Sequence, residues 1–267
     1  MRLWKSWILA KKDLAIMRKR RSLATAILTF PLGLGIALPL LIEYIIIRKS
    51  ATVTIVSSLL GAFPFFFIIL SALLPLYISS YGIVGEKTEK SLEPLLATPT
   101  SDGEILMGKY IGAFLPVLGA IYLGLTIFMF LTDLLTVSKI GHFFYPNWGM
   151  AIVYFLGAPF ACIYGVSTGV FVSSKVNNIQ GAYQIGAFSL IPLYALYILG
   201  EIGIVSLSSN TNLLIISAGL LVAVILMYML SRATFNRESI LTKWKRCAWF
   251  RDSSQDDDPY HYHLDSL

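Results

Sequence analysis

The sequence has few charged residues and only two cysteines. Of its 267 residues, 13% are charged and 56% are hydrophobic, whereas a soluble domain carries about 25% charged residues. This scarcity of charge excludes an ordinary soluble domain and is typical of a protein that crosses a membrane several times. Cys162 and Cys247 are too few for a disulfide framework. Cys162 lies in an apolar run, where we expect an inert buried thiol.

The N-terminus also lacks the short apolar core of a cleaved signal peptide. Its apolar run begins only near Leu23, is too long for such a core and contains Pro31 and Pro39. We therefore expect the N-terminal segment to remain part of the protein.

Long charge-free runs predict six membrane-spanning helices. A helix needs about 20 residues to cross the hydrocarbon core of a bilayer. Six stretches qualify, at about 23–45, 56–81, 108–131, 148–173, 181–200 and 212–231. The predicted fold class is an all-α integral membrane protein. We assign residues 1–231 to a six-span transmembrane domain and residues 232–267 to a C-terminal tail that is partly disordered.

The basic residues predict the orientation. Of the 21 lysines and arginines, 18 lie in residues 1–22, 82–109, 174–180 and 232–267. Because lysine and arginine accumulate in cytoplasmic loops, we expect both termini in the cytoplasm. The net charge of +6 is then a topology signal and indicates no nucleic-acid partner. Trp148, at the outer end of the fourth span, fits an interfacial aromatic residue.

Residues 1–21 predict an amphipathic helix that lies on the inner leaflet and contacts membrane lipids. Placed at 100° per residue, one side carries Leu3, Trp4, Trp7, Ala10, Leu14 and Met17. Lys5, Lys12, Asp13 and Lys19 are expected to lie away from that side. In the acidic tail, His261 and His263 are only weak candidates for metal binding.

The loop between the second and third spans, residues 82–104, is the most charged part of the region between the ends. Gly103, followed five residues later by Gly108-Lys109, has the spacing of a phosphate-binding loop. That loop needs a serine or threonine after the lysine and a preceding strand. Here Tyr110 follows and a membrane span precedes, so we exclude nucleotide binding at this position.

The same loop predicts a short helix parallel to the membrane, over about 91–97. Ser91 can cap it, Pro94 suits its first turn, and Thr98-Pro99 ends it. Leu92, Leu95 and Leu96 give it an apolar side, while Glu86, Glu89 and Glu93 keep the loop in water. Ser101 and Glu104 form the S-x-x-E pattern of a capping box, so the third span begins about Glu104 and Lys109 enters the inner leaflet. From the residues alone, this segment is either a docking element for another protein or an ordinary charged linker.

The stretch GEKTEKSLEPLLATPTSDGEILMGKYIG resembles the signature of the permease subunits of type-2 ABC exporters. The residues in step with that signature are Glu86, Leu92, Glu93, Leu95, Leu96, Thr98, Pro99, Ser101, Glu104, Ile105, Gly108 and Lys109. The departures are Lys90-Ser91, where the family usually has Gly-Thr, and Pro94. The family has a cytoplasmic elbow helix, six spans and both termini inside, as expected above.

The resemblance implies a function and partners. This chain would be the membrane-spanning permease subunit of an ATP-driven exporter, with a second permease subunit, identical or different, and a separate cytoplasmic ABC ATPase subunit that hydrolyses ATP. It would need no cofactor, metal or catalytic residue of its own. The short helix at 91–97 would be the coupling helix that sits in a cleft of the ATPase. The stretch SSKVNNIQGA, residues 173–182, would be a second cytoplasmic contact. The implied ATPase-coupling residues are Glu86, Glu89, Ser91, Leu92, Glu93, Leu95, Leu96, Thr98 and Pro99. The helix cap and re-entry residues are Ser101, Glu104, Gly108 and Lys109.

Two other classes were weighed. A stand-alone secondary transporter or channel is disfavoured because ion-coupled transporters usually carry carboxylates or histidines in mid-membrane, and these spans hold almost none. An integral-membrane enzyme is disfavoured because no nucleophile, histidine and acid cluster is evident. Six tyrosines within the spans, which either line a pathway or pack the bundle, are Tyr122, Tyr154, Tyr164, Tyr183, Tyr194 and Tyr197; we favour packing.

Overall fold

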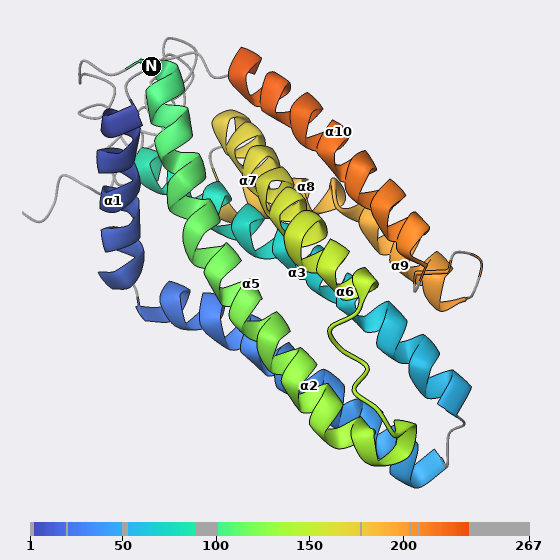
Figure 1. The fold of residues 1–267 in the computed structure, drawn as a ribbon. Helices are drawn as coiled ribbons and strands as arrows, with labels where there is room; N and C mark the ends of the chain where they lie inside the picture. The colour runs from blue at the N-terminus through green and yellow to red at the C-terminus, as the bar shows by residue number, and fades with distance from the viewer. Residues whose placement is uncertain are drawn as a thin grey trace, which may run out of the picture.

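The structure is a computed structural model that describes residues 3–19, 21–49, 53–88, 101–176, 178–202, 204, 206–207 and 209–234. Within these ranges every regular element is helical, which confirms the predicted all-α fold class (Figure 1). The elements are α1 (Leu3–Lys19), α2 (Arg21–Lys49), α3 (Val53–Thr88), α5 (Asp102–Ile140), α6 (Trp148–Ile152), the π-helical turn η1 (Val153–Gly157), α7 (Ala158–Lys175), α8 (Ile179–Phe188), α9 (Ile191–Glu201) and α10 (Asn210–Thr234).

Five helical stretches are long and apolar enough to cross a membrane. They are Ala24–Ile45, Leu59–Gly82, Gly103–Ser138, Trp148–Lys175 and Asn210–Arg232. The bent pair α8 and α9 supplies a sixth if the two count as one span. The predicted set of spans therefore matches the structure, and the chain is a multi-pass membrane protein.

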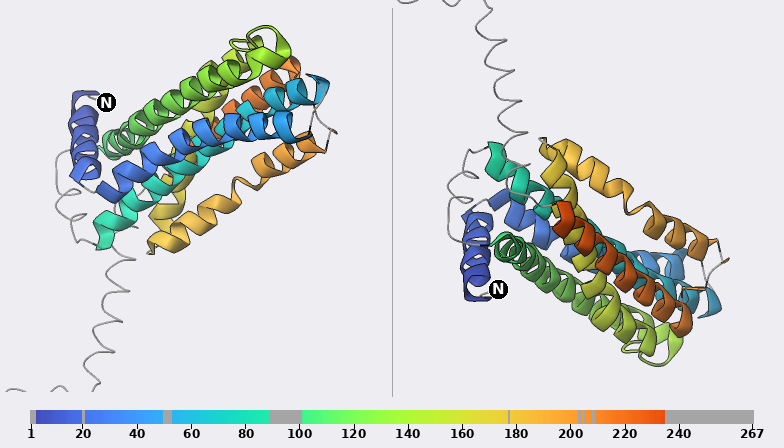
Figure 2. Two further views of the ribbon diagram at one scale, coloured as in Figure 1. Left: turned by 90° about the horizontal axis from the view of Figure 1, so that it is seen from below. Right: turned by 90° about the horizontal axis from the view of Figure 1, so that it is seen from above.

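The fifth span differs from the continuous helix predicted at 181–200. α8 and α9 meet at an angle of 45°, and Figure 2 shows the bend between them. Pro192 has no N–H to donate to the carbonyl of Phe188, which favours a break here. The Tyr164 hydroxyl donates to the Ser189 carbonyl at 3.0 Å, and the Ser189 hydroxyl donates to the Gly186 carbonyl at 2.6 Å. These bonds supply partners for the backbone at the break.

Two helices run past the predicted ends of their spans. α3 continues through Glu86 to Thr88, and α5 continues through Asp133 to Ile140, beyond the expected ends at 81 and 131. A charged residue limits how far a helix lies in lipid, but it does not stop the helix itself. The connection between the predicted third and fourth spans, residues 132–147, is correspondingly shorter because α5 ends only at Ile140.

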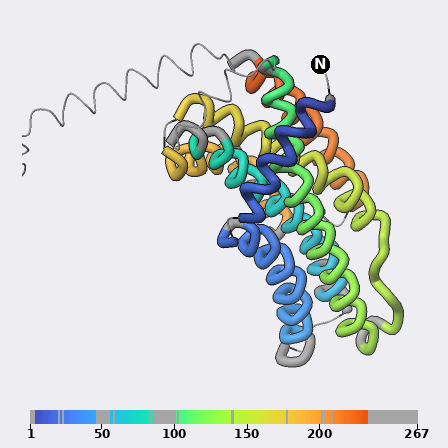
Figure 3. Tube along the Cα trace, turned by 90° about the vertical axis from the view of Figure 1, so that its left-hand side faces the viewer, coloured from blue at the N-terminus to red at the C-terminus, as the bar shows by residue number. Residues whose placement is uncertain are grey.

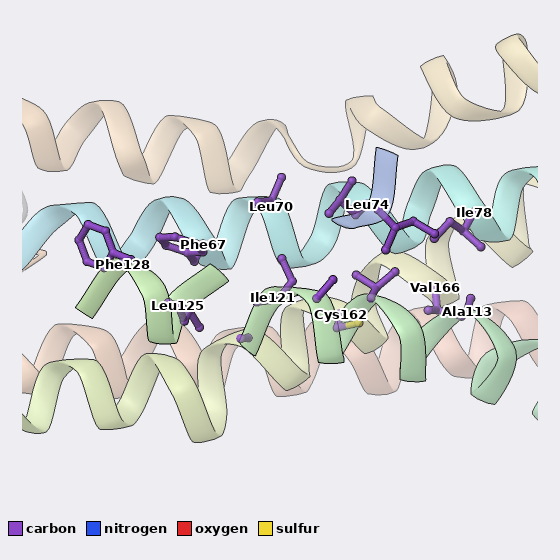
Figure 4. Close-up of a cluster of buried hydrophobic side chains, with 14 of the residues drawn as sticks. Phe67, Leu70, Leu74, Ile78, Ala113, Ile121, Leu125, Phe128, Cys162 and Val166 are labelled. Atoms are coloured by element: carbon purple, nitrogen blue, oxygen red, sulfur yellow. The ribbon is translucent and has the colours of Figure 1, made fainter. Parts of the chain in front are cut away.

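α3 is the central helix of the bundle. In its apolar window 72% of the residues are buried, against 28% for α2 and 22% for α10, so α2 and α10 lie at the surface of the bundle. Figure 4 shows how the core forms. Phe67, Leu70, Leu74 and Ile78 of α3 meet Ala113, Ile121, Leu125 and Phe128 of α5 and Cys162 and Val166 of α7.

Small residues let α7 approach α3 closely. Ala161, Gly165 and Gly169 recur every four residues on the buried side of α7. A Cβ atom on Gly165 would collide with the Ala72 carbonyl, and one on Gly169 would collide with the Ser79 hydroxyl. Because lipid is as apolar as leucine, membrane helices associate through such close packing rather than through the hydrophobic effect.

The N-terminal part of α3 and the C-terminal part of α5 are joined by a hydrogen-bonded turn. The Asp133 carboxylate accepts the backbone N–H groups of Phe144 and Tyr145 at 3.0 and 3.1 Å. The Tyr145 hydroxyl donates to the Leu60 carbonyl at 2.6 Å, which lacks a helical donor because Pro64 stands four residues later. Burial, and then the Asp133 charge, raise the pKa of Tyr145 well above its ordinary value, so the hydroxyl keeps the proton that it donates.

Most tyrosines of the spans pack against other rings. Tyr122 and Tyr154 stack at 4.2 Å between ring centroids, Tyr183 meets Tyr77 edge-on, and Tyr197 meets Phe66 edge-on. These contacts support the packing role that we favoured from the sequence.

Candidate functional site

The start of α5 is capped by its own side chains. The Ser101 hydroxyl accepts the Glu104 N–H at 3.3 Å, and the Glu104 carboxylate accepts the Ser101 N–H at 3.0 Å. This is the capping box that the S-x-x-E pattern predicts. Two N–H groups at the helix end are thereby satisfied, and a buried carboxylate lies at the positive end of the helix dipole. The cap defines where α5 starts, at Asp102 immediately after Ser101.

Lys109 ties three helices together. Its ammonium group donates to the Gly82 carbonyl near the end of α3 at 2.9 Å, and lies 4.0 Å from the Asp13 carboxylate of α1. The side chain is only 5% exposed. The prediction that Lys109 simply enters the inner leaflet is therefore incomplete. The packing of α1 against α5 encloses the lysine, and a buried cation requires partners of this kind.

Glycines allow α1 to pack directly on α5. A Cβ atom on Gly108 would lie 2.7 Å from the Leu9 Cβ and 3.0 Å from the Ser6 carbonyl, and one on Gly112 would lie 3.1 Å from the Asp13 Cβ. Two glycines four residues apart form one groove on a helix surface. Figure 3 shows α1 running across the first part of α5.

The face of α1 that packs on α5 lies beside the predicted apolar side and overlaps it at Ala10. Ser6 and Ala10 are buried, and Asp13, which the periodicity placed away from the apolar side, faces α5. Trp4 is 73% exposed, and Lys11 holds its ammonium 5.8 Å from the centroid of the Trp7 ring. The side chains that contact Gly108 and Gly112 are those of Leu9 and Asp13, so part of the apolar side of α1 stays outside this contact.

We call this arrangement the junction, defined as Ser6, Ala10 and Asp13 of α1, Gly82 of α3, and Ser101, Glu104, Gly108, Lys109 and Gly112 of α5. It adjoins both described ends of the loop at 82–104.

The comparison with protein families identifies the chain. The model of the ABC-2 family transporter proteins matches residues 7–202, well over half of the sequence. The chain belongs to the ABC-2 transporter family. The family resemblance seen in residues 85–112 is thereby confirmed. A comparison with curated proteins gives no match.

As an ABC-2 family member, the chain is a membrane permease component of an ABC transporter. The permease family is not itself catalytic. The match extends from α1 to the residue after α9 and contains every member of the junction except Ser6. In the described ranges, no group of three or more histidines, cysteines or acids is placed to hold a metal.

The junction unites only part of the residues expected for this permease. Ser101, Glu104, Gly108 and Lys109 lie together in it, and Glu86 lies in α3. The other expected coupling residues lie outside the described ranges: Glu89, Ser91, Leu92, Glu93, Leu95, Leu96, Thr98 and Pro99.

Five members of the junction were not expected as site residues from the sequence of this permease. They are Ser6, Ala10, Asp13, Gly82 and Gly112. Gly108 and Gly112 carry the G-x-x-x-G spacing of close helix contacts, and this signal could have revealed both Gly112 and the packing of α1. Gly82 contributes only its backbone carbonyl, for which the sequence carries no signal.

Proposed function

We propose that this ABC-2 permease works with a separate cytoplasmic ABC ATPase subunit as an exporter, and that residues 82–104 couple the two. The observation that carries the proposal is the Lys109 contact, because it joins the two helices that flank this loop to each other and to α1. Because the two helices are connected at Lys109, a displacement of the loop would move both helices together. If the helix ends were not connected, the loop could change shape without moving either helix.

The loop carries the residues that would meet the ATPase. Leu92, Leu95 and Leu96 form the apolar side of the coupling helix at 91–97, which Ser91 caps and Thr98-Pro99 ends. Glu86, Glu89 and Glu93 hold the loop in water, because a charge at mid-membrane costs about 2.5–3.5 kcal/mol on insertion scales.

Movement would pass from the loop into the core. Closure of two ATPase subunits on ATP would displace the coupling helix, and the junction would carry that displacement into α3 and α5. α3 is the most buried of the long helices, so its tilt would rearrange the bundle. A second permease subunit, identical or different, would complete the substrate pathway.

The proposed location is the cell membrane with both termini in the cytoplasm. The lysine and arginine distribution supports this orientation. Residues 1–231 would form the transmembrane domain and 232–267 a cytoplasmic tail. α1 would be the elbow helix on the inner leaflet, where the exposed Trp4 and Trp7 and the basic Lys11 suit contact with lipid headgroups.

Co-purification tests the partner. The chain is expressed with the ATPase subunit encoded beside it, as wild type and with Leu95→Asp and Leu96→Asp. We expect both changes to abolish recovery of the ATPase, because each places a charge on the apolar side of the coupling helix. Leu264→Asp in the tail is the matched control and should leave recovery unchanged. Recovery that is equal for all variants contradicts the proposal.

The stand-alone transporter gains no support from the distribution of buried charge. Among the residues that the structure describes, the buried charged side chains are Glu104 and Lys109. Both lie in the first turns of α5, in the capping and bracing roles described above, rather than at mid-membrane where coupling ions are bound.

A further inference from the structure

A cavity lies at the end of the bundle opposite the junction. Its volume is about 250 Å³, and it opens between α3, α6 and α10. Its floor consists of the buried side chains of Leu60, Met150 and Leu213. This volume accommodates a single headgroup or sugar ring rather than a large solute.

The carboxamide side chains of Asn147 and Asn210 both lie close to Gly149 in the lining of this cavity. A Cβ atom on Gly149 would lie 3.4 Å from the Asn210 Oδ1 and 3.5 Å from the Asn147 Oδ1. Asn147 also caps α6, since its Oδ1 accepts the Met150 N–H at 2.8 Å. That bond orients the side chain and leaves its amide N–H groups to serve a ligand.

The position of the cavity along the spans corresponds to the depth of lipid headgroups. Most of its lining residues lie near the starts of three candidate spans, Leu59–Gly82, Trp148–Lys175 and Asn210–Arg232, and Phe144 and Asn147 precede the second of these. Trp148 stands at the rim with 79% of its side chain exposed, as aromatic residues do at the membrane interface. An amphiphile in the adjacent leaflet can therefore bring its headgroup to the rim while its chain stays in lipid.

The chemistry of the lining selects an uncharged, hydroxyl-bearing headgroup. No charged side chain is among the described lining residues, so an anionic headgroup lacks the lysine or arginine that phosphate recognition uses. The nearby Asp133, which accepts the N–H of the lining residue Phe144, further disfavours an anion. Carboxamides both donate and accept, as hydroxyl groups require, and an indole offers an apolar face beside a polar N–H.

We propose that the cavity over Gly149 binds the uncharged polyhydroxyl headgroup, a sugar or glycerol, of an amphiphile in the adjacent leaflet. Asn147 and Asn210 hydrogen-bond the hydroxyl groups, and Trp148 covers the less polar face of the headgroup. The site needs no ATPase. Only its assignment to the outer leaflet rests on the proposed topology, so the test below can fail or succeed independently of the proposed function.

Trp148 serves as its own reporter. Full-length protein in phosphatidylcholine nanodiscs, with Trp4, Trp7, Trp244 and Trp249 changed to phenylalanine, is titrated with hexyl glucoside, hexyl phosphate or hexyltrimethylammonium below their micelle concentrations. We expect hexyl glucoside alone to change the Trp148 fluorescence saturably. Saturable binding of the phosphate or ammonium probe with equal or higher affinity overturns the proposed ligand class.

Three variants test the location of binding. Gly149→Leu fills the mouth, and Gly119→Leu on α5, where a Cβ atom would meet nothing within 4 Å, is its control. Asn147→Ser with Asn210→Ala removes both carboxamides while serine keeps the helix cap. We expect Gly149→Leu and the double variant to weaken glucoside binding at least about tenfold, which is 1.4 kcal/mol, and Gly119→Leu to leave it unchanged. A glucoside response that is non-saturable, or equal in all variants, overturns the site.

Discussion

Replacing Lys109 with methionine tests whether the junction braces the helices around the coupling loop. Methionine keeps an unbranched stem of similar length but cannot donate to the Gly82 carbonyl, a bond of 2.9 Å, or face Asp13 across 4.0 Å. A hydrogen bond from a charged donor contributes about 1.5–3 kcal/mol. The Asp13 side chain keeps 20% of its surface exposed, so the loss of that ion pair adds at most about 1 kcal/mol.

We therefore expect Lys109→Met to lower the stability of the purified protein by about 2–3 kcal/mol, allowing for the relief of a buried charge. For a chain of this size that corresponds to a fall in Tm of roughly 4–12 °C. The assay is thermal unfolding in detergent followed by size-exclusion chromatography. Lys11→Met, which removes an exposed lysine of α1, is the matched control and should change Tm little.

A double-mutant cycle isolates the ion pair within that effect. Asp13→Asn alone should be mildly destabilising, and it should cost less when Lys109 is already methionine, because the two groups interact. The reasoning about the brace is refuted if Lys109→Met unfolds at the same temperature as wild type and Lys11→Met. If the effects of Lys109→Met and Asp13→Asn on stability add strictly, the ion pair is refuted. The hydrogen bond to the Gly82 carbonyl would then account for the whole effect of Lys109→Met.

Three further changes probe other contacts by the same unfolding assay. Ser101→Ala should destabilise the protein by about 0.5–2 kcal/mol through loss of the α5 cap. Ser101→Asp should have a Tm close to that of wild type, because aspartate also caps helices. Equal Tm values for the two variants would contradict the capping role. Gly169→Val should destabilise by about 1–3 kcal/mol or more because α7 must move away from α3. Gly219→Val is the control, because a Cβ atom there meets nothing within 4 Å, and it should leave the stability unchanged. Equal losses for the two variants would refute close packing as the cause. Tyr145→Phe should cost about 1–3 kcal/mol because the Leu60 carbonyl loses its donor while buried; an unchanged Tm would show that another donor replaces the hydroxyl.

The spans were predictable because their signal is local. A run without charge, such as 22–42 before Glu43, identifies a membrane helix from composition alone. The capping box was predictable for the same reason, since Ser101 and Glu104 are three residues apart in one turn. The break at Ser189-Leu190 carried a weaker signal in Pro192, because a proline in a membrane helix is often tolerated and its effect depends on whether neighbours such as Tyr164 supply a partner.

The brace was not predictable from local pattern. Whether Lys109 reaches lipid headgroups or a buried carbonyl depends on which helix covers it, and that is decided by the groove at Gly108 and Gly112. The 100° periodicity of residues 3–17 separates Asp13 from the apolar side of α1. It carries no signal that the side with Asp13 packs on the glycines of α5. The partner of Lys109 on α3 is a backbone carbonyl, which any residue at position 82 would present.

The most direct test of the coupling proposal is photo-crosslinking from the loop in intact cells. A benzoylphenylalanine residue is placed at Leu95, and in a separate variant at Leu123, which is 54% exposed and lies within the candidate span Gly103–Ser138 of α5. The account predicts an ultraviolet-dependent adduct between position 95 and the ATPase subunit encoded beside this permease, and none from position 123. Absence of that adduct at position 95, with the complex otherwise expressed, or the same adduct from position 123, would contradict the claim that this loop docks the ATPase.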